Sequence, residues 1–173
     1  MVLTVPPDSL RPTVAFVPSE NALHLQEHQS EVDHPRQLWE TWNAGHITDA
    51  DLRGLISFAW LYSQAPEQVL ATERWVAMLK ATGVLVQPTD LELPVPGQDL
   101  FRAATESHIQ RMAWYVRRSD AEAILPRHAR CGPAGIYLSE LNDQAVLAHF
   151  KRADEGQEVL LDPHGIGDVI RID

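Results

Sequence analysis

The sequence predicts an α+β protein, with helices in its first half and short strands in its second half. Between residues 36 and 83, apolar residues recur at the spacing of a helix that packs one face against a core. After residue 98, short runs rich in β-branched and aromatic residues alternate with turn-forming residues. A length of 173 residues suits one well-filled core, so we expect a single compact unit.

The stretch 1–35 shows no sustained hydrophobic period. Prolines recur through it at Pro6, Pro7, Pro12, Pro18 and Pro35. Proline fixes φ and cannot donate a backbone hydrogen bond, so it interrupts regular elements. We therefore expect an irregular N-terminal arm over residues 1–35.

Residues 36–97 are predicted to form a helical subdomain. A short helix over RQLWETWNAG (36–45) places Leu38 and two tryptophans on one side, with Gly45 as its stop. Thr48 can cap a second helix. The apolar stripe of this second helix consists of Leu52, Leu55, Ile56, Ala59 and Trp60. Both helices are therefore expected to face a shared core.

A third helix is expected to start at Pro66 and to stop at Gly83, because proline suits a first helical position and glycine a helix end. The tryptophans of all three helices are interpreted as core residues: Trp39, Trp42, Trp60 and Trp75. The Pro-rich segment LVQPTDLELPVPGQ (85–98) then crosses to the second half of the chain.

Residues 98–173 are predicted to be β-rich. The strand-type runs are DLFRA (99–103), MAWYV (112–116), GIYLSEL (135–141), VLAHF (146–150), EVLLD (158–162) and DVIRI (168–172). One helix interrupts them: Ser119 and Glu122 form a capping-box pattern, and Pro126 is expected to end or kink that helix.

Charge and composition narrow the classes of function. A formal charge of −10 argues against nonspecific nucleic-acid binding, which needs clustered lysine and arginine. No apolar run approaches the length needed to cross a bilayer, and the N-terminus lacks the pattern of a secretion signal. The lone Cys131 cannot form an internal disulfide, which fits a reducing environment. We expect a cytoplasmic protein without membrane contact.

A series of short motifs in the second half resembles a known family. Arg102 ends DLFRA, and RMAWYV, GIYLSEL, LNDQAVLAHF and QEVLLDP follow in that order. This order resembles actinobacterial and phage proteins of the ADP-ribosyltransferase fold, in a pattern that spans roughly residues 36–170. The resemblance implies a helical N-terminal part packed on a split, mainly antiparallel β-sheet of ADP-ribosyltransferase type. It also implies an NAD-dependent mono-ADP-ribosyltransferase, which cleaves the ribose–nicotinamide bond and modifies a protein or another macromolecule.

The resemblance assigns roles to particular residues. Glu158 would be the catalytic carboxylate that stabilises positive charge on the ribose. Arg102 would hold the pyrophosphate of NAD, and Trp114 with Tyr115 would line the nicotinamide pocket. NAD is then a substrate, and no metal is implied. From the residues alone, Arg102 could instead form a surface ion pair and Trp114 could belong to the core.

Several positions depart from the family pattern. Ala103 stands where glycine follows the arginine, and Ala113 stands where a serine supports the site. Glu155 would position the acceptor, but matching it to the first acid of the family's pair requires a one-residue insertion, because Gly156 occupies the expected place. These departures favour an alternative function: a catalytically weak or inactive relative that binds a partner protein, such as a phage inhibitor of host defence.

A separate pattern points to a third class. His24 and His28 in HLQEH match H-x-x-E-H, in which a helix presents two histidines to zinc and a glutamate to a water. The prolines around this stretch argue against the buried helix that such a site needs. Zinc hydrolysis is therefore the weakest of the three hypotheses.

Overall fold

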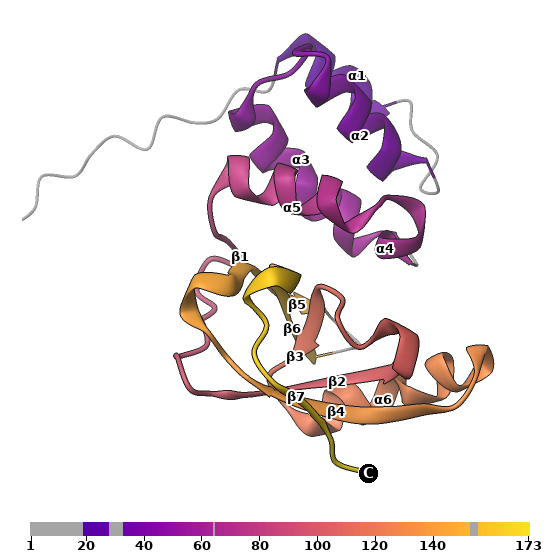
Figure 1. Ribbon diagram of the computed structural model, residues 1–173. Helices are drawn as coiled ribbons and strands as arrows, with labels where there is room; N and C mark the ends of the chain where they lie inside the picture. Colours follow the sequence, from indigo (N-terminus) through magenta and orange to yellow (C-terminus); the bar gives the residue numbers. More distant parts are fainter. Residues whose placement is uncertain (1–18, 28–32, 64, 153–155) are drawn as a thin grey trace, which may run out of the picture.

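The computed structural model describes residues 19–27, 33–63, 65–152 and 156–173. Within them the protein combines helices with one mixed sheet, so the expected α+β class is confirmed. Five helices precede most of the sheet: α1 (Glu20–Glu27), α2 (His34–Asn43), α3 (Asp49–Leu61), α4 (Pro66–Val69) and α5 (Thr72–Thr82). They lie together on one side of the sheet (Figure 1).

The sheet contains seven strands in the described residues, in the order β1-β5-β6-β3-β2-β4-β7. Their bounds are β1 (Leu85–Gln87), β2 (Asp99–Thr105), β3 (Ala113–Tyr115), β4 (Ala134–Glu140), β5 (Val146–Arg152), β6 (Gly156–Leu161) and β7 (Val169–Arg171). Only β1 and β5 pair in parallel, and every other neighbouring pair is antiparallel. The expectation of a mainly antiparallel sheet is therefore confirmed.

The sheet is weakest between β2 and β3. A single registered pair, Phe101 with Tyr115, joins these two strands, whereas β2 pairs with β4 along its whole length. Three-residue β3 is otherwise held by β6 on its other side. The two halves of the sheet are thus joined by one narrow contact, and the functional candidates lie on both sides of it.

Two hydrophobic layers cover the sheet. The helices α3 and α5 pack against β1, β5 and β6 through a core that includes Trp60, Trp75 and Phe150, all almost fully buried. The sixth helix, α6 (Arg118–His128), packs against β2 and β4 through Ala121 and Ile124. The stripe expected on the second helix, from Leu52 to Trp60, is buried as predicted.

The helix ends differ from the expectations in instructive ways. Thr48 caps α3 together with Asp51 in a reciprocal capping box, as Thr48 was expected to do. The expected helix from Pro66 to Gly83 is instead broken at Leu70, whose backbone is extended. Burying the Leu70 side chain in the core overrides local helix propensity here.

The helix α6 also differs from its expectation. Its N-cap is Arg117, so the predicted capping box of Ser119 and Glu122 is wrong. The carboxylate of Asp120 accepts from the backbone N–H of Gln157 at 3.2 Å, which connects the first turn of the helix to β6. Pro126 lies inside the helix, which continues to His128.

Two elements were not expected. The helix α1 lies within the stretch 1–35, for which no regular element was predicted. Strand β1 lies in the Pro-rich crossing and forms through its pairing with β5. No helix in the described ranges has the length and apolar character needed to cross a membrane.

Candidate functional site

A pocket of about 600 Å³ lies between the helical part and the sheet. Residues 60–63, at and after the end of α3, and residues 65–68, in and around α4, form one wall. Strands β2, β3, β5 and β6 contribute side chains to the opposite wall, and the end of α6 closes one side. Among the predicted site residues, those that line this pocket are Arg102, Ala103, Ala113, Tyr115 and Glu158.

Arg102 occupies the gap between β2 and β3. Its Nε donates to the carbonyl oxygen of His108 at 3.1 Å, and its Nη1 donates to the carbonyl oxygen of Ala113 in β3. The guanidinium thus supplies hydrogen bonds where the two strands no longer pair with each other. Arg102 is only 4% exposed, so the expected alternative of a surface ion pair with its neighbours in sequence is wrong.

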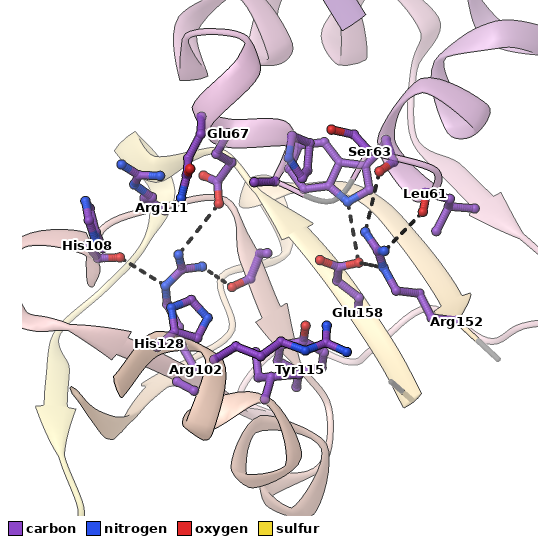
Figure 2. Close-up of a pocket in the computed structure, with 18 of the residues that line it drawn as sticks. Leu61, Ser63, Glu67, Arg102, His108, Arg111, Tyr115, His128, Arg152 and Glu158 are labelled. Atoms are coloured by element: carbon purple, nitrogen blue, oxygen red, sulfur yellow. Dashed lines mark hydrogen bonds and ion pairs between the residues drawn. The ribbon is translucent and has the colours of Figure 1, made fainter. Parts of the chain in front are cut away.

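The counter-ion of Arg102 comes from the helical part. Glu67 of α4 places its Oε2 3.6 Å from Nη2 of Arg102, and its Oε1 accepts from the backbone N–H of Met112 at 2.8 Å. Burial lowers the pKa of the Arg102 guanidinium, and the Glu67 carboxylate opposes that effect. An acid therefore already occupies the place where an anionic ligand would meet this arginine (Figure 2).

Glu158 is the third residue of β6 and is 3% exposed. Its Oε2 accepts from Nε of Arg152 at 2.7 Å and lies 3.4 Å from Nε1 of Trp60. Arg152 also donates to the carbonyl oxygen of Leu61 at 3.1 Å. The carboxylate is therefore held between a strand and the end of α3, facing the pocket (Figure 2).

The pairing of β5 with β6 explains this ion pair. Arg152 is registered with Gly156, so Glu158 is its diagonal neighbour, two residues further along the partner strand. Diagonal neighbours share one face of a sheet and come within reach of a long side chain. The chain on both sides of the hairpin thus presents a cation and an anion to the same pocket.

Tyr115 and Trp114 do not share a wall, because their side chains follow the usual alternation of a strand and face opposite sides of the sheet. Ala113 and Tyr115 line the pocket, and Ala103 packs beside Tyr115. Trp114 lies on the other face, fully buried, with its Nε1 donating to the carbonyl oxygen of Arg111 at 3.0 Å. Trp114, which was expected beside Tyr115, therefore does not line this pocket.

The first position of β6 has a packing constraint. Gly156 has φ +81°, and a Cβ at this position would overlap the carboxylate of Asp120. A side chain at this position would therefore require the Asp120 carboxylate to move and would strain the backbone. Glu155, the expected acceptor-positioning residue, lies outside the described residues.

Sequence reasoning missed the partners of the two central residues, Glu67 and Arg152. A hairpin register between VLAHFKR and GQEVLL would have placed Arg152 diagonal to Glu158, so the signal was present for that pair. Glu67 reaches Arg102 from 35 positions away in the sequence, and no local spacing indicates this contact. Trp60 was predicted as core and is buried, yet its indole also borders the pocket.

In the described ranges, no group of three or more His, Cys, Asp or Glu side chains is arranged to hold a metal ion. His28 lies outside the described residues, and the side chain of His24 is not described either, so the zinc hypothesis is not addressed. Comparisons with protein-family models, curated proteins and solved structures find no match for this chain.

Proposed function

We propose that the protein binds NAD in this pocket and cleaves the bond between ribose and nicotinamide, as a mono-ADP-ribosyltransferase of the ADP-ribosyltransferase fold. The observation that carries the proposal is the convergence of Glu158, Arg102 and Tyr115 on one pocket from three different strands. A volume of about 600 Å³ lies within the usual range of roughly 300–1,000 Å³ for small-molecule sites.

The charge of the pocket supports a ligand that carries phosphate. Four arginines and two glutamates line it, although the whole chain has a formal charge of −10. Arginine presents a planar set of donors that matches phosphate oxygens. A pocket rich in arginine within an acidic protein indicates a site for an anionic ligand.

The two internal ion pairs support a ligand that carries both signs of charge. A diphosphate bound to Arg102 would take the place of the Glu67 carboxylate, and a cationic sugar–nicotinamide group would take the place of Arg152 beside Glu158. NAD carries a diphosphate and a cationic nicotinamide in one molecule. Arg102 and Glu158 would therefore keep a partner of opposite charge after such an exchange, whereas Glu67 and Arg152 would have to leave their present positions.

In the proposed reaction, the C1′–nitrogen bond breaks, and its electron pair leaves with nicotinamide. Glu158 stabilises the positive charge that develops on the ribose. Tyr115 offers an aromatic surface to the cationic ring. A nucleophile on a protein or another macromolecule then forms the new bond to C1′ and loses its proton.

The test compares nicotinamide release from NAD by the wild type, Glu158→Gln and Glu122→Gln. Glu122 is an exposed glutamate on α6 outside the pocket, so its variant is the matched control. We expect release to fall by about a hundred-fold or more in Glu158→Gln and to stay unchanged in Glu122→Gln. Equal release in all three proteins would remove Glu158 from the mechanism. Labelled NAD in a cell lysate would then reveal the acceptor.

A second candidate function is a protein-binding module without catalysis. The observation that favours it is that Arg102 and Glu158 both have close internal partners, an arrangement that also suits a purely structural role. Calorimetric titration with NAD separates the two candidates. A binding module should give no heat of binding, and Arg102→Lys should then leave the titration unchanged.

A further inference from the structure

The side chain of Trp60 reaches Glu158 from the helical part. Trp60 lies in the last turn of α3, and its indole Nε1 donates to Oε2 of Glu158 at 3.4 Å, across 98 positions of the sequence. The residue is 1% exposed, yet it lines the pocket next to the candidate catalytic carboxylate. The proposed reaction uses that carboxylate and leaves the indole without a role.

Packing in the helical core fixes the direction of the indole. The ring of Trp60 meets the ring of Trp75 edge to face, with the ring centroids 5.0 Å apart and an interplanar angle of 79°. Trp75 is fully buried, and its own Nε1 donates to the carbonyl oxygen of Pro66 at 3.0 Å. Side chains in a close-packed core sit in well-defined rotamers. The helices therefore set the direction of the Trp60 N–H, whereas the sheet carries Glu158.

A purely structural role in the core does not require a charged acceptor. A buried indole N–H needs a hydrogen-bond partner, and a backbone carbonyl oxygen is sufficient. The other two tryptophans that are buried in the described residues both use one: Trp75 donates to Pro66, and Trp114 donates to Arg111 at 3.0 Å. Trp60 donates instead to a carboxylate that lines the pocket. Of these three tryptophans, Trp60 is the one that connects the core to the site.

The indole differs in charge from another donor to the same oxygen. Nε of Arg152 donates to Oε2 of Glu158 at 2.7 Å and belongs to a cation. In the proposed reaction, the cationic sugar takes the place of Arg152. An indole N–H is uncharged and only donates, so it can hold the carboxylate without competing with that cation. Because the ring of Trp60 is part of the helical core, this donor stays in place when Arg152 leaves.

We propose that Trp60 is a positioning residue, whose indole N–H holds the Glu158 carboxylate in the orientation that stabilises the ribose cation. This inference rests on the proposed function, because the orientation of Glu158 matters for the reaction only when a ligand is bound. A carboxylate that turns away from the developing charge stabilises it less. A misplacement of about 1 Å at a reacting centre can lower the rate by roughly a hundred-fold.

The test variant is Trp60→Phe, which removes the N–H and keeps an aromatic ring in the core. The matched control is Trp114→Phe, because Trp114 is also fully buried, donates to a backbone carbonyl oxygen and does not line the pocket. We expect kcat for nicotinamide release to fall about ten-fold or more in Trp60→Phe, while the Kd for ADP-ribose in calorimetry changes by less than about two-fold. In Trp114→Phe, both quantities should stay within about two-fold of the wild type. An unchanged kcat in Trp60→Phe, or an equal loss in both variants, overturns the inference.

A second measurement tests the inference even if Trp60→Phe does not fold. Heteronuclear NMR of the wild type and Glu158→Gln follows the indole N–H of Trp60, which should shift upfield when its charged acceptor becomes a neutral amide. The indole of Trp42 is the reference, because it donates at 2.8 Å to Asp49, a carboxylate outside the pocket. A Trp60 resonance that moves no more than that of Trp42 overturns the inference.

Failure of this inference and failure of the proposed function give different results. If the wild type releases no nicotinamide, the proposed function fails, and the role of Trp60 in it fails as well. If the wild type and Trp60→Phe release nicotinamide at the same rate, the role of Trp60 fails and the proposed function stands.

Discussion

Replacing Glu158 with glutamine should cost stability as well as activity. Glu158 is the charged partner of Arg152, at 2.7 Å between Oε2 and Nε. The side chains of the two residues are 5% and 17% exposed, respectively, so solvent compensates little for a lost charge. The substitution would remove the Glu158 charge from beside the largely buried Arg152 guanidinium.

The magnitude follows from what remains around Arg152. Breaking a buried ion pair by removing one partner typically costs about 3–5 kcal/mol. Glutamine keeps an oxygen acceptor near Nε, and the carbonyl oxygen of Leu61 still accepts from Arg152 at 3.1 Å. We therefore expect a loss of about 2 kcal/mol, which corresponds to a fall in Tm of roughly 4–8 °C for a chain of this length.

Urea unfolding of a double-mutant cycle measures this effect. The cycle consists of wild type, Glu158→Gln, Arg152→Met and the double variant. Each single variant should have a lower free energy of unfolding than the wild type. The loss in the double variant should be smaller than the sum of the two single losses by about 1–2 kcal/mol. Additive losses, or a Glu158→Gln variant within about 0.5 kcal/mol of wild type, would refute the reasoning. Nicotinamide release from this variant must therefore be measured well below its Tm.

Three further predictions concern Gly156, His34 and Glu67. Gly156→Ala should destabilise the protein by about 2 kcal/mol or more in urea unfolding, because φ is +81° and the new Cβ would overlap the Asp120 carboxylate; in an Asp120→Ala background the loss should shrink. Burial lowers the pKa of His34 to about 4, whereas the pKa in the unfolded chain is near 6.5. Above pH 6.5 the imidazole is neutral in both states, so its burial contributes fully to the free energy of unfolding. Acidification from pH 6.5 to pH 4 should therefore remove about 3 kcal/mol in the wild type and not in His34→Leu. Glu67→Gln should tighten the binding of ADP-ribose about ten-fold in calorimetry, because a competing anion no longer faces Arg102.

The sequence predicted those elements that depend on contacts between residues close together in the chain. The stripe on α3 and its Thr48 cap depend on residues within a few turns of one another, and both were anticipated. The break at Leu70 and the start of α6 involve contacts with distant segments, a core side chain in one case and β6 in the other. Such long-range contacts produce no hydrophobic periodicity from which they could be predicted.

The same distinction holds for the site. Arg102, Tyr115 and Glu158 were anticipated and line one pocket, whereas strand alternation removes Trp114 from it. The usual alternation of side chains along a strand already favoured opposite faces for Trp114 and Tyr115. Glu67 could not have been found, because its approach to Arg102 requires the helical part to be placed over the sheet.

Residues from both sides of the expected boundary at residue 97 contribute to the same pocket. Glu67 and Trp60, from the helical part, contact Arg102 and Glu158, from the β-rich part. A buried charge without its partner is strongly destabilising, so neither part can keep its native arrangement of charges without the other. The narrow joint between β2 and β3 creates the gap that Arg102 fills, and the helical part supplies the acid that neutralises it. A ligand that replaces Glu67 at Arg102 would therefore also loosen the contact between the helical part and the sheet, which couples binding at the pocket to the packing of the two layers.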